Sequence, residues 1–292
     1  MGIMPASAFE GRKGEDMKIQ SISAALVASA FLCSGAHADT LDIAVDSSPA
    51  GLDPHLVTAF SSVIVIGDTI YEGLTTIAED LSVQPGLATG WDISDDGLSY
   101  TFSLASGVTF HDGSAMTAED VAASLRRVQN EEMASPLASR ISPITGINVI
   151  DDATVELSLD APFAPILTSL AGIAIVPAEM ETDKESLQMT PVGTGPFMFE
   201  EWVPNSYIQL AAFSDFRDSS MPKIDAVKYN IVPEAATRQV GLVSGQYDLL
   251  PGVDPATALQ LQSASGIMMH ETRDLSYTLI GINTTRAPFD NP

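Results

Sequence analysis

The sequence predicts an α/β fold with a mixed sheet, because short strand patterns and helix patterns alternate along the chain. Tyr100, Phe102 and Leu104 alternate with small or polar residues, which is the period of a half-buried strand. Farther on, Thr117 is followed three residues later by Asp120, a pair that can cap the start of a helix. The sequence contains neither internal repeats nor low-complexity segments.

The composition is that of an acidic chain long enough for about two compact units. Its 292 residues carry 38 Asp and Glu against 13 Lys and Arg, for a formal net charge of −25. Since no cluster of Lys and Arg is present to neutralise phosphates, we exclude nucleic acid as a partner. The charge favours solubility and opposes binding to an anionic membrane surface.

The N-terminus has the pattern of a secretory signal peptide. A basic start at Met17-Lys18 precedes an apolar run, Ile22 to Leu32, and the cleavage motif Ala36-His37-Ala38. We expect an upstream extension and signal over 1–38, cleavage after Ala38, and a periplasmic or otherwise extracytoplasmic product. The apolar run is too short to span a bilayer, so we expect no stable membrane insertion of the mature chain.

Cys33 is the only cysteine and lies inside the expected signal. The mature chain should therefore contain neither disulfides nor cysteine-based metal or redox sites. Lipid attachment at Cys33 is the alternative, although Ala30-Phe31-Leu32 fits a lipoprotein motif poorly. Residues 1–16 precede an ordinary-looking signal, which suggests a start codon assigned too early.

The mature chain should begin with a strand over 41–45 that runs into a loop rich in Ser, Pro and Gly. The most strongly patterned stretch is 91–130. There we expect a turn at 95–97, the strand described above, a second short strand over Val108–Phe110 and a turn at 111–113. The capped helix that follows carries an apolar stripe of Val121, Leu125 and Val128.

The later elements continue the alternation. We expect a strand over Thr154–Leu159, a helix from Pro162 to Leu170, a short buried strand over Gly172–Val176, a polar linker over 179–184, a hairpin of Phe197–Val203 and Tyr207–Phe213, a strand over Ile224–Val232, a helix over Glu234–Ser244 stopped by Gly245, a helix begun by Asp254-Pro255, and a strand over Leu275–Asn283.

Several motifs carry a resemblance. W-x-x-S-x-D-G-x-x-Y-x-F-x-L from Trp91, G-V-x-F-x-D-G from Gly107 and A-E-D-V-x-x-S-x-x-R from Ala118 resemble the signature of the family 5 solute-binding proteins. G-T-G-P at 193–196 and R-x-x-x-L-x-x-G-x-x-D from Arg238 are also similar to that family. Its members are extracytoplasmic receptors of peptide, dipeptide and nickel ABC importers.

The resemblance implies the first lobe of a type II periplasmic-binding-protein-like fold. A first-lobe core would be built from 39–62 and 186–292, with a smaller α/β subdomain of 63–185 inserted. The chain ends in A-P-F-D-x-P, which in the family leads toward the second lobe. We therefore expect the second lobe to be missing, and the chain alone to bind weakly and to aggregate.

The resemblance also implies a function and a site. The function would be capture of a peptide or other small solute for ABC permease subunits, through closure of two lobes. The strand end and loop over 46–55 would lie at the edge of the ligand cleft, which gives Ser47, Ser48, Phe60 and Ser61 as candidate ligand contacts. An ordinary Ser-Pro-Gly turn is the equal alternative for the two serines. Tyr71 is expected in the core.

The residues do not form a recognisable catalytic constellation. The sequence has no H-E-x-x-H, no histidine pair at helical spacing and no G-x-S-x-G. His111-Asp112-Gly113-Ser114 is better explained as a β-turn, and the Asp95-Asp96 and Asp151-Asp152 pairs as solvated turns. We expect neither an enzyme nor a cofactor nor a metal site.

Met268-Met269-His270 could form a soft metal site, but we expect the two methionines to pack in the core from a strand. A nickel or other non-peptide solute receptor of the same family is the alternative function. A secreted hydrolase is the outside alternative.

Overall fold

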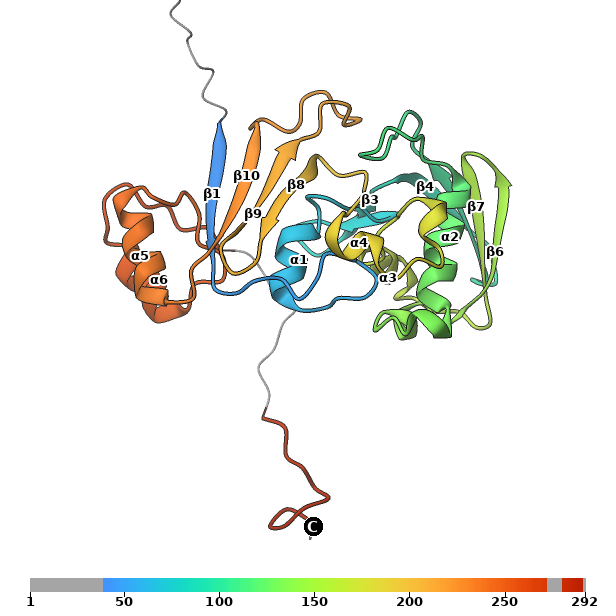
Figure 1. Ribbon diagram of the computed structural model, residues 1–292. Coiled ribbons are helices and arrows are strands. Elements are labelled where there is room, and N and C mark those ends of the chain that lie inside the picture. Colours follow the sequence, from blue (N-terminus) through green and yellow to red (C-terminus); the bar gives the residue numbers. More distant parts are fainter. Residues whose placement is uncertain (1–38, 272–279, 291–292) are drawn as a thin grey trace, which may run out of the picture. The chain divides into compact units, whose positions relative to one another are not determined.

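The computed structural model describes residues 39–271 and 280–290, shown in Figure 1. The first sheet has the strand order β1-β10-β9-β8 and joins the first described strand to three strands from residues 197–231. Its strands are β1 (Thr40–Val45), β8 (Phe197–Val203), β9 (Tyr207–Ala212) and β10 (Ala226–Ile231). β1 pairs with β10 in parallel, and the other pairs are antiparallel. The predicted mixed sheet is therefore confirmed.

β1 is bordered by parallel backbone on both edges. One edge of β1 pairs with β10. On the other edge, Ala44 donates its N–H to the carbonyl of Leu249 at 3.0 Å, and Asp248 donates its N–H to the carbonyl of Asp42 at 2.7 Å. Asp248 and Leu249 lie between α5 (Ala235–Ser244) and α6 (Pro255–Leu261). Both predicted boundaries are confirmed, since Gly245 ends α5 with a φ of 75° and the Asp254 carboxylate accepts from the first N–H groups of α6.

The second sheet is antiparallel throughout, in the order β4-β5-β7-β6. It consists of β4 (Ala88–Ile93), β5 (Ser99–Leu104), β6 (Ile144–Asp151) and β7 (Thr154–Leu159). The predicted alternation is confirmed in both β5 and β7. The buried residues are Tyr100, Phe102 and Leu104 in β5, and Val155, Leu157 and Leu159 in β7. They share a hydrophobic core with the stripe of Val121, Leu125 and Val128 on α2 (Ala118–Gln129). The predicted capping box of Thr117 and Asp120 is present.

Short elements complete the described chain. They are α1 (Phe60–Ile66), the pair β2 (Thr75–Ile77) and β3 (Val83–Pro85), α3 (Ile166–Ala171), α4 (Ser186–Met189), and the 3-10 turns η1 (Glu131–Met133), η2 (Ala138–Arg140) and η3 (Ala178–Met180). Tyr71 is buried in the core beside α1, as predicted.

Two predicted strands are wrong. In Val108–Phe110, only Thr109 forms a bridge, to Ala115. In Gly172–Val176, only Ala174 forms a bridge, to Gly73. The second segment fails as a strand because side chains take several of its backbone groups. The carbonyl of Ala174 accepts from a histidine, and both polar backbone groups of Val176 bond to a serine hydroxyl.

Two further predictions need correction. The helix expected from Pro162 begins only at Ile166, because Pro165 disfavours helical conformation in the residue before it. Met268 is 84% exposed and Met269 is also exposed, so core packing is wrong for these methionines, and no strand is assigned there. Most of the predicted strand over Leu275–Asn283 lies outside the described residues.

The described residues belong to one unit that spans Ala38–Pro292. Its first sheet takes strands from residues 40–45 and 197–231, and the second takes strands from residues 88–159, between them. The division into 39–62 plus 186–292 and an inserted 63–185 stays a prediction. Within the described part of the chain, no helix is long and apolar enough to cross a membrane.

Candidate functional site

A buried ionic cluster ties the loop after β1 to helix α2. Arg127 is fully buried and donates two hydrogen bonds to Asp53, from Nη1 to Oδ1 at 3.0 Å and from Nη2 to Oδ2 at 2.6 Å. The same guanidinium donates to the carbonyls of Met180 at 2.8 Å and Asp183 at 2.6 Å. A charge buried this deeply is stable only when paired and hydrogen-bonded, and Arg127 meets both conditions.

His55 completes the cluster as a neutral imidazole. Its Nδ1 lies 3.0 Å from Arg127 Nη1, which can only donate, so Nδ1 accepts and Nε2–H donates to the carbonyl of Ala174 at 2.8 Å. Burial, together with the positive charge of Arg127, lowers the pKa of His55 from 6.5 to about 4. The Ala174 carbonyl and the Asp53 carboxylate oppose that shift.

The polar residues of the A-E-D-V-x-x-S-x-x-R motif lie on one face of α2, because positions i, i+4 and i+7 align on a helix. Asp120 Oδ1 accepts from the N–H of Ala178 at 2.8 Å. Ser124 Oγ lies 2.9 Å from the N and 3.2 Å from the O of Val176. Together with Arg127, these residues hold the segment 174–183 against the helix. In this structure their role is to build the fold.

The G-T-G-P segment packs directly on the backbone that follows α1. A Cβ added to Gly195 would lie 2.2 Å from the carbonyl oxygen of Thr69, which no side chain allows. The N–H of Gly195 donates to the carbonyl of Ile70 at 2.9 Å. His111 donates from Nε2 to the carbonyl of Gly195 at 3.0 Å, so the predicted turn at 111–114 also helps to hold this segment.

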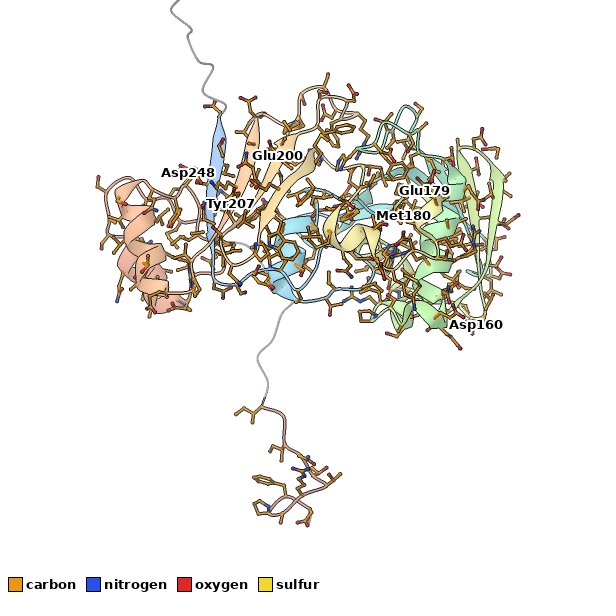
Figure 2. All side chains as sticks on the ribbon, in the orientation of Figure 1. Asp160, Glu179, Met180, Glu200, Tyr207 and Asp248 are labelled. Carbon is orange, nitrogen blue, oxygen red and sulfur yellow. The ribbon has the colours of Figure 1, made fainter. Side chains whose placement is uncertain are left out.

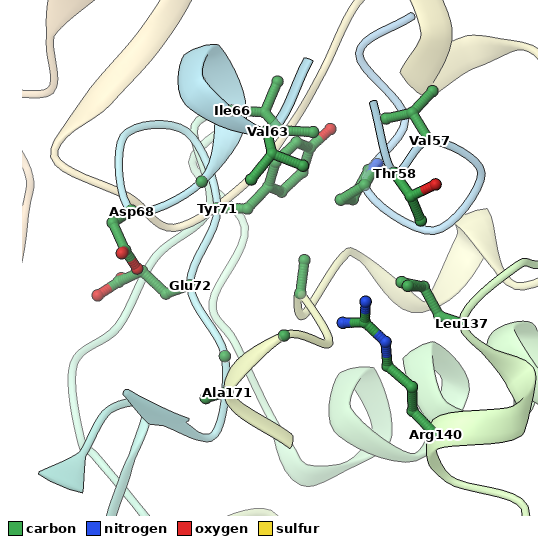
Figure 3. Close-up of a pocket in the computed structure, with 15 residues that line it drawn as sticks. Val57, Thr58, Val63, Ile66, Asp68, Tyr71, Glu72, Leu137, Arg140 and Ala171 are labelled. Atoms are coloured by element: carbon green, nitrogen blue, oxygen red, sulfur yellow. The ribbon is translucent and has the colours of Figure 1, made fainter. Parts of the chain in front are cut away.

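Ala174, whose carbonyl accepts from His55, also lines a pocket of about 280 Å³, drawn in Figure 3. It lies between the loop before α1, α1 itself, η2 and the end of α3. Its wall is mostly apolar, with Val57, Val63, Ile66, Tyr71, Leu137 and Ala174. Such a wall with a few polar groups is typical of a small-ligand site.

Three charged side chains also line this pocket: Asp68, Glu72 and Arg140. Glu72 already has partners, since it accepts from Thr194 Oγ1 at 3.0 Å and forms an ion pair with Arg217. The side chains of Asp68 and Arg140 make no hydrogen bond or ion pair with any residue in 39–271 or 280–290. Asp68 is exposed at the molecular surface, yet partial desolvation raises the pKa of its carboxyl.

The four residues predicted as ligand contacts divide into two pairs. Phe60 and Ser61 come together in a small cavity of about 70 Å³ at the end of β1, with Asp46 and Arg238. Phe60 is 70% exposed. Ser47 instead donates to its neighbour Asp46 at 2.8 Å, and Ser48 Oγ lies 3.5 Å from the N of Asn205. Ligand contact by all four therefore stays a prediction.

Among the residues of the larger pocket, the sequence pointed only to Pro54, within the loop 46–55, and to Tyr71 as a core residue. Thr58 and Val63 flank the predicted Phe60 and Ser61, so a wider window around that motif would have included them. Asp68 and Arg140 stand far apart in the sequence and belong to no motif. Only the fold reveals that they line the same cavity.

Among the described residues, no group of three or more His, Cys, Asp and Glu side chains is arranged to hold a metal ion. The predicted turn positions of Asp95, Asp96, Asp151 and Asp152 are all exposed, as expected.

Known proteins with a similar sequence or fold are binding proteins. The chain is similar to the glutathione-binding protein GsiB of Pectobacterium atrosepticum, with 31% identity over 253 residues, 86% of this chain and 49% of that protein. Its structure is similar to the periplasmic binding protein DppA from Helicobacter pylori in complex with peptide STSA, with a TM-score of 0.69 and 31% identity over 77% of this chain and 49% of that one.

A second solved structure with a similar fold is NikZ from Campylobacter jejuni in complex with Ni(L-His). It matches with a TM-score of 0.71 and 26% identity, over 78% of this chain and 46% of that one. The chain thus spans about half the length of the relatives it matches. These structures confirm the predicted fold class, an α/β fold of the type II periplasmic binding proteins.

The family described as "Bacterial extracellular solute-binding proteins, family 5 Middle" matches residues 82–292. This range includes most of the motifs that carry the resemblance. The chain therefore belongs to the bacterial extracellular solute-binding proteins of family 5.

Proposed function

We propose that this chain is part of the substrate-binding component of an ABC importer and that its ligands are peptides. The observation that carries the proposal is the pocket of Figure 3, which has an apolar wall and two charged side chains without partners in the described residues. Family membership and the ligands named for GsiB and DppA, glutathione and a peptide, support this ligand class.

The protein would capture its ligand rather than transform it. The relatives are binding proteins, and the described charged residues near the pocket serve either the fold or an open binding surface. We further propose that the cavity containing Phe60 and Ser61 extends the binding surface beyond the main pocket, and that Ser47 and Ser48, which follow its lining residue Asp46 in the sequence, also contact the ligand. Permease subunits of the importer would be the protein partner.

We also propose that the protein is exported. We place the mature protein in the periplasm, with cleavage after Ala38, because the N-terminal residues have the order of a signal peptide and the family is extracellular. The mass of the exported product tests this directly. An intact N-terminus, or a lipid on Cys33, would contradict it.

The alternative is a receptor for a nickel chelate or another non-peptide solute, which the structural similarity to NikZ favours. A thermal-shift experiment on the full chain separates these ligands. A ligand that binds only the native state raises stability by about 2.7 kcal/mol when present at roughly 100 times its Kd. We expect stabilisation by trialanine or glutathione. Stabilisation by Ni(L-His) alone would favour the alternative, and ester or glycoside turnover would favour a hydrolase.

Two valine variants link the shift to the pocket. Val63 lines the pocket from α1 and is 45% exposed, whereas Val243 lies on α5, away from it, and is 56% exposed. Either valine can become aspartate without burying a charge. We expect Val63→Asp to abolish most of the peptide-induced shift and Val243→Asp to retain it. Equal shifts in both variants would place peptide binding elsewhere.

A further inference from the structure

We propose that His55, which is buried next to the pocket of Figure 3, is a positioning residue that holds three parts of the pocket wall together and thereby sets the affinity for the ligand. This inference rests on the proposed function, because it concerns the same pocket. It goes further in assigning ligand affinity to a fully buried residue whose neighbours, rather than its own side chain, line the cavity.

The first part of the wall is the loop before α1, to which His55 itself belongs. Pro54 lines the pocket and stands between Asp53 and His55, both of which are fully buried. The N–H of His55 donates to Asp53 Oδ1 at 2.9 Å, and the same oxygen accepts from Arg127. The carboxylate that binds Arg127 therefore also fixes the backbone on both sides of Pro54.

The second part of the wall is the chain after α3, where Gly172 and Ala174 line the pocket. His55 donates from Nε2 to the carbonyl of Ala174 at 2.8 Å. Residues 172–176 form a single isolated bridge rather than a regular strand. Contacts from side chains such as His55 therefore decide where this backbone lies.

The third part of the wall is the chain at the start of η2, where Leu137 lines the pocket. The backbone carbonyl of His55 accepts from Ser135 Oγ at 2.6 Å, and Ser135 Oγ accepts from the N–H of Leu137 at 3.2 Å. All three residues are buried, so water competes little for these bonds. One serine hydroxyl thus connects His55 to the third part of the wall.

Arg127 fixes the imidazole in the orientation that these contacts need. Its Nη1 lies 3.0 Å from His55 Nδ1 and can only donate, so the proton of the ring is on Nε2 and is directed to Ala174. The guanidinium is itself held by the Asp53 carboxylate and by the carbonyl of Met180, which is labelled in Figure 2. The imidazole therefore has one tautomer and one position.

Three segments that are far apart in the sequence thus meet at one residue. A pocket that is assembled before the ligand arrives binds more tightly than one that must first be ordered. If the parts of the wall separate, only the fraction of molecules with an assembled pocket can bind, and the apparent Kd rises in inverse proportion to that fraction. Loss of the His55 contacts should therefore weaken binding even in a chain that stays folded.

The test is calorimetric titration of the full chain with trialanine at neutral pH. His55→Leu keeps an apolar side chain but removes the hydrogen bonds of the ring, and we expect it to bind about tenfold more weakly, as when about a tenth of the molecules have an assembled pocket. His55→Gln keeps a donor and an acceptor and should restore most of the affinity. Circular dichroism would show that each variant is folded.

Two buried serines provide a matched pair of milder variants, which decide the question if His55→Leu does not fold. Ser135→Ala breaks the connection to Leu137 and should weaken trialanine binding by about threefold or more. Ser124→Ala also removes a buried hydroxyl, but its partner Val176 does not line the pocket. We expect Ser124→Ala to lower the free energy of unfolding in urea and to bind trialanine like the unmodified chain.

Amide hydrogen exchange measures the positioning without a ligand. In His55→Leu, the amides of residues 137–141 and 171–175 should exchange faster, and by a larger factor than those of β5 in the second sheet. His55→Gln should exchange like the unmodified chain in all three segments. A residue that only stabilised the whole fold would change the three segments alike.

The outcomes that would overturn the inference differ from those that would overturn the proposed function. If His55→Leu binds trialanine like the unmodified chain, or if the two serine variants weaken binding equally, the positioning role is wrong while peptide capture stands. If trialanine does not bind the unmodified chain and glutathione gives no thermal shift, the proposed peptide ligand fails. Hydrogen exchange then decides the positioning role, and an equal change in all three segments would overturn it.

Discussion

The buried histidine predicts how stability depends on pH. His55 has a pKa of about 4 in the folded protein and an ordinary value of 6.5 when unfolded. The unfolded chain therefore binds a proton in a pH range where the native cluster does not. The contribution of His55 to stability is complete above pH 6.5 and is lost as the pH falls toward 4. A difference of this size corresponds to about 3 kcal/mol.

The perturbation that isolates this effect is His55→Gln. Glutamine can still donate to the Ala174 carbonyl and accept from Arg127, but it does not titrate. The free energy of unfolding of both proteins would be measured by urea denaturation at intervals from pH 7 to pH 4.5. We expect the stability advantage of the unmodified protein over His55→Gln to shrink steadily over this range, by a large part of about 3 kcal/mol.

A control separates His55 from general acid effects. His270→Gln changes an exposed histidine outside the cluster and should leave the pH dependence of the unmodified protein unchanged. Carboxylates titrate in the same range, but they do so in every variant and therefore cancel in the comparison. A constant difference between the unmodified protein and His55→Gln from pH 7 to pH 4.5 would refute a neutral, buried His55.

Two further predictions test the buried contacts by urea denaturation. Arg127→Met leaves the Asp53 carboxylate buried without its partner and should destabilise the protein by about 3–5 kcal/mol; near-normal stability would show that water reaches this site. Gly195→Ala places a methyl group 2.2 Å from a backbone oxygen and should cost about 1–3 kcal/mol, whereas Gly90→Ala, with open space around it, should be nearly neutral. Equal effects of the two glycine variants would contradict the close packing.

Much of the fold could be predicted from the sequence, namely those helices and strands that bury one face in a hydrophobic core. The strand at 99–104 and the stripe on α2 are examples, since period and capping residues specify them locally. The segment 172–176 could not be predicted in this way. Its hydrogen bonds go to the side chains of His55 and Ser124, which lie far away in the sequence.

The site was less predictable than the fold. Resemblance indicated the region around Phe60 and Ser61, whose sequence neighbours Thr58 and Val63 line the larger pocket. Asp68 and Arg140 had no local signal, because neither belongs to a motif and their proximity depends on how α1 and η2 are placed. A charged side chain without a partner can be recognised only from the three-dimensional contacts of the groups around it.

The residues of the family signature differ from those of the proposed ligand site. Asp120, Ser124 and Arg127 bind backbone and buried side chains, so the signature predicts the fold without specifying a ligand. On our proposal, the ligand binds in the pocket of Figure 3, whose lining residues lie outside those motifs. It follows that a protein with the same signature and a different pocket wall should keep this architecture and bind a different ligand. This separation is consistent with one fold serving the glutathione, peptide and nickel-chelate ligands named for the relatives.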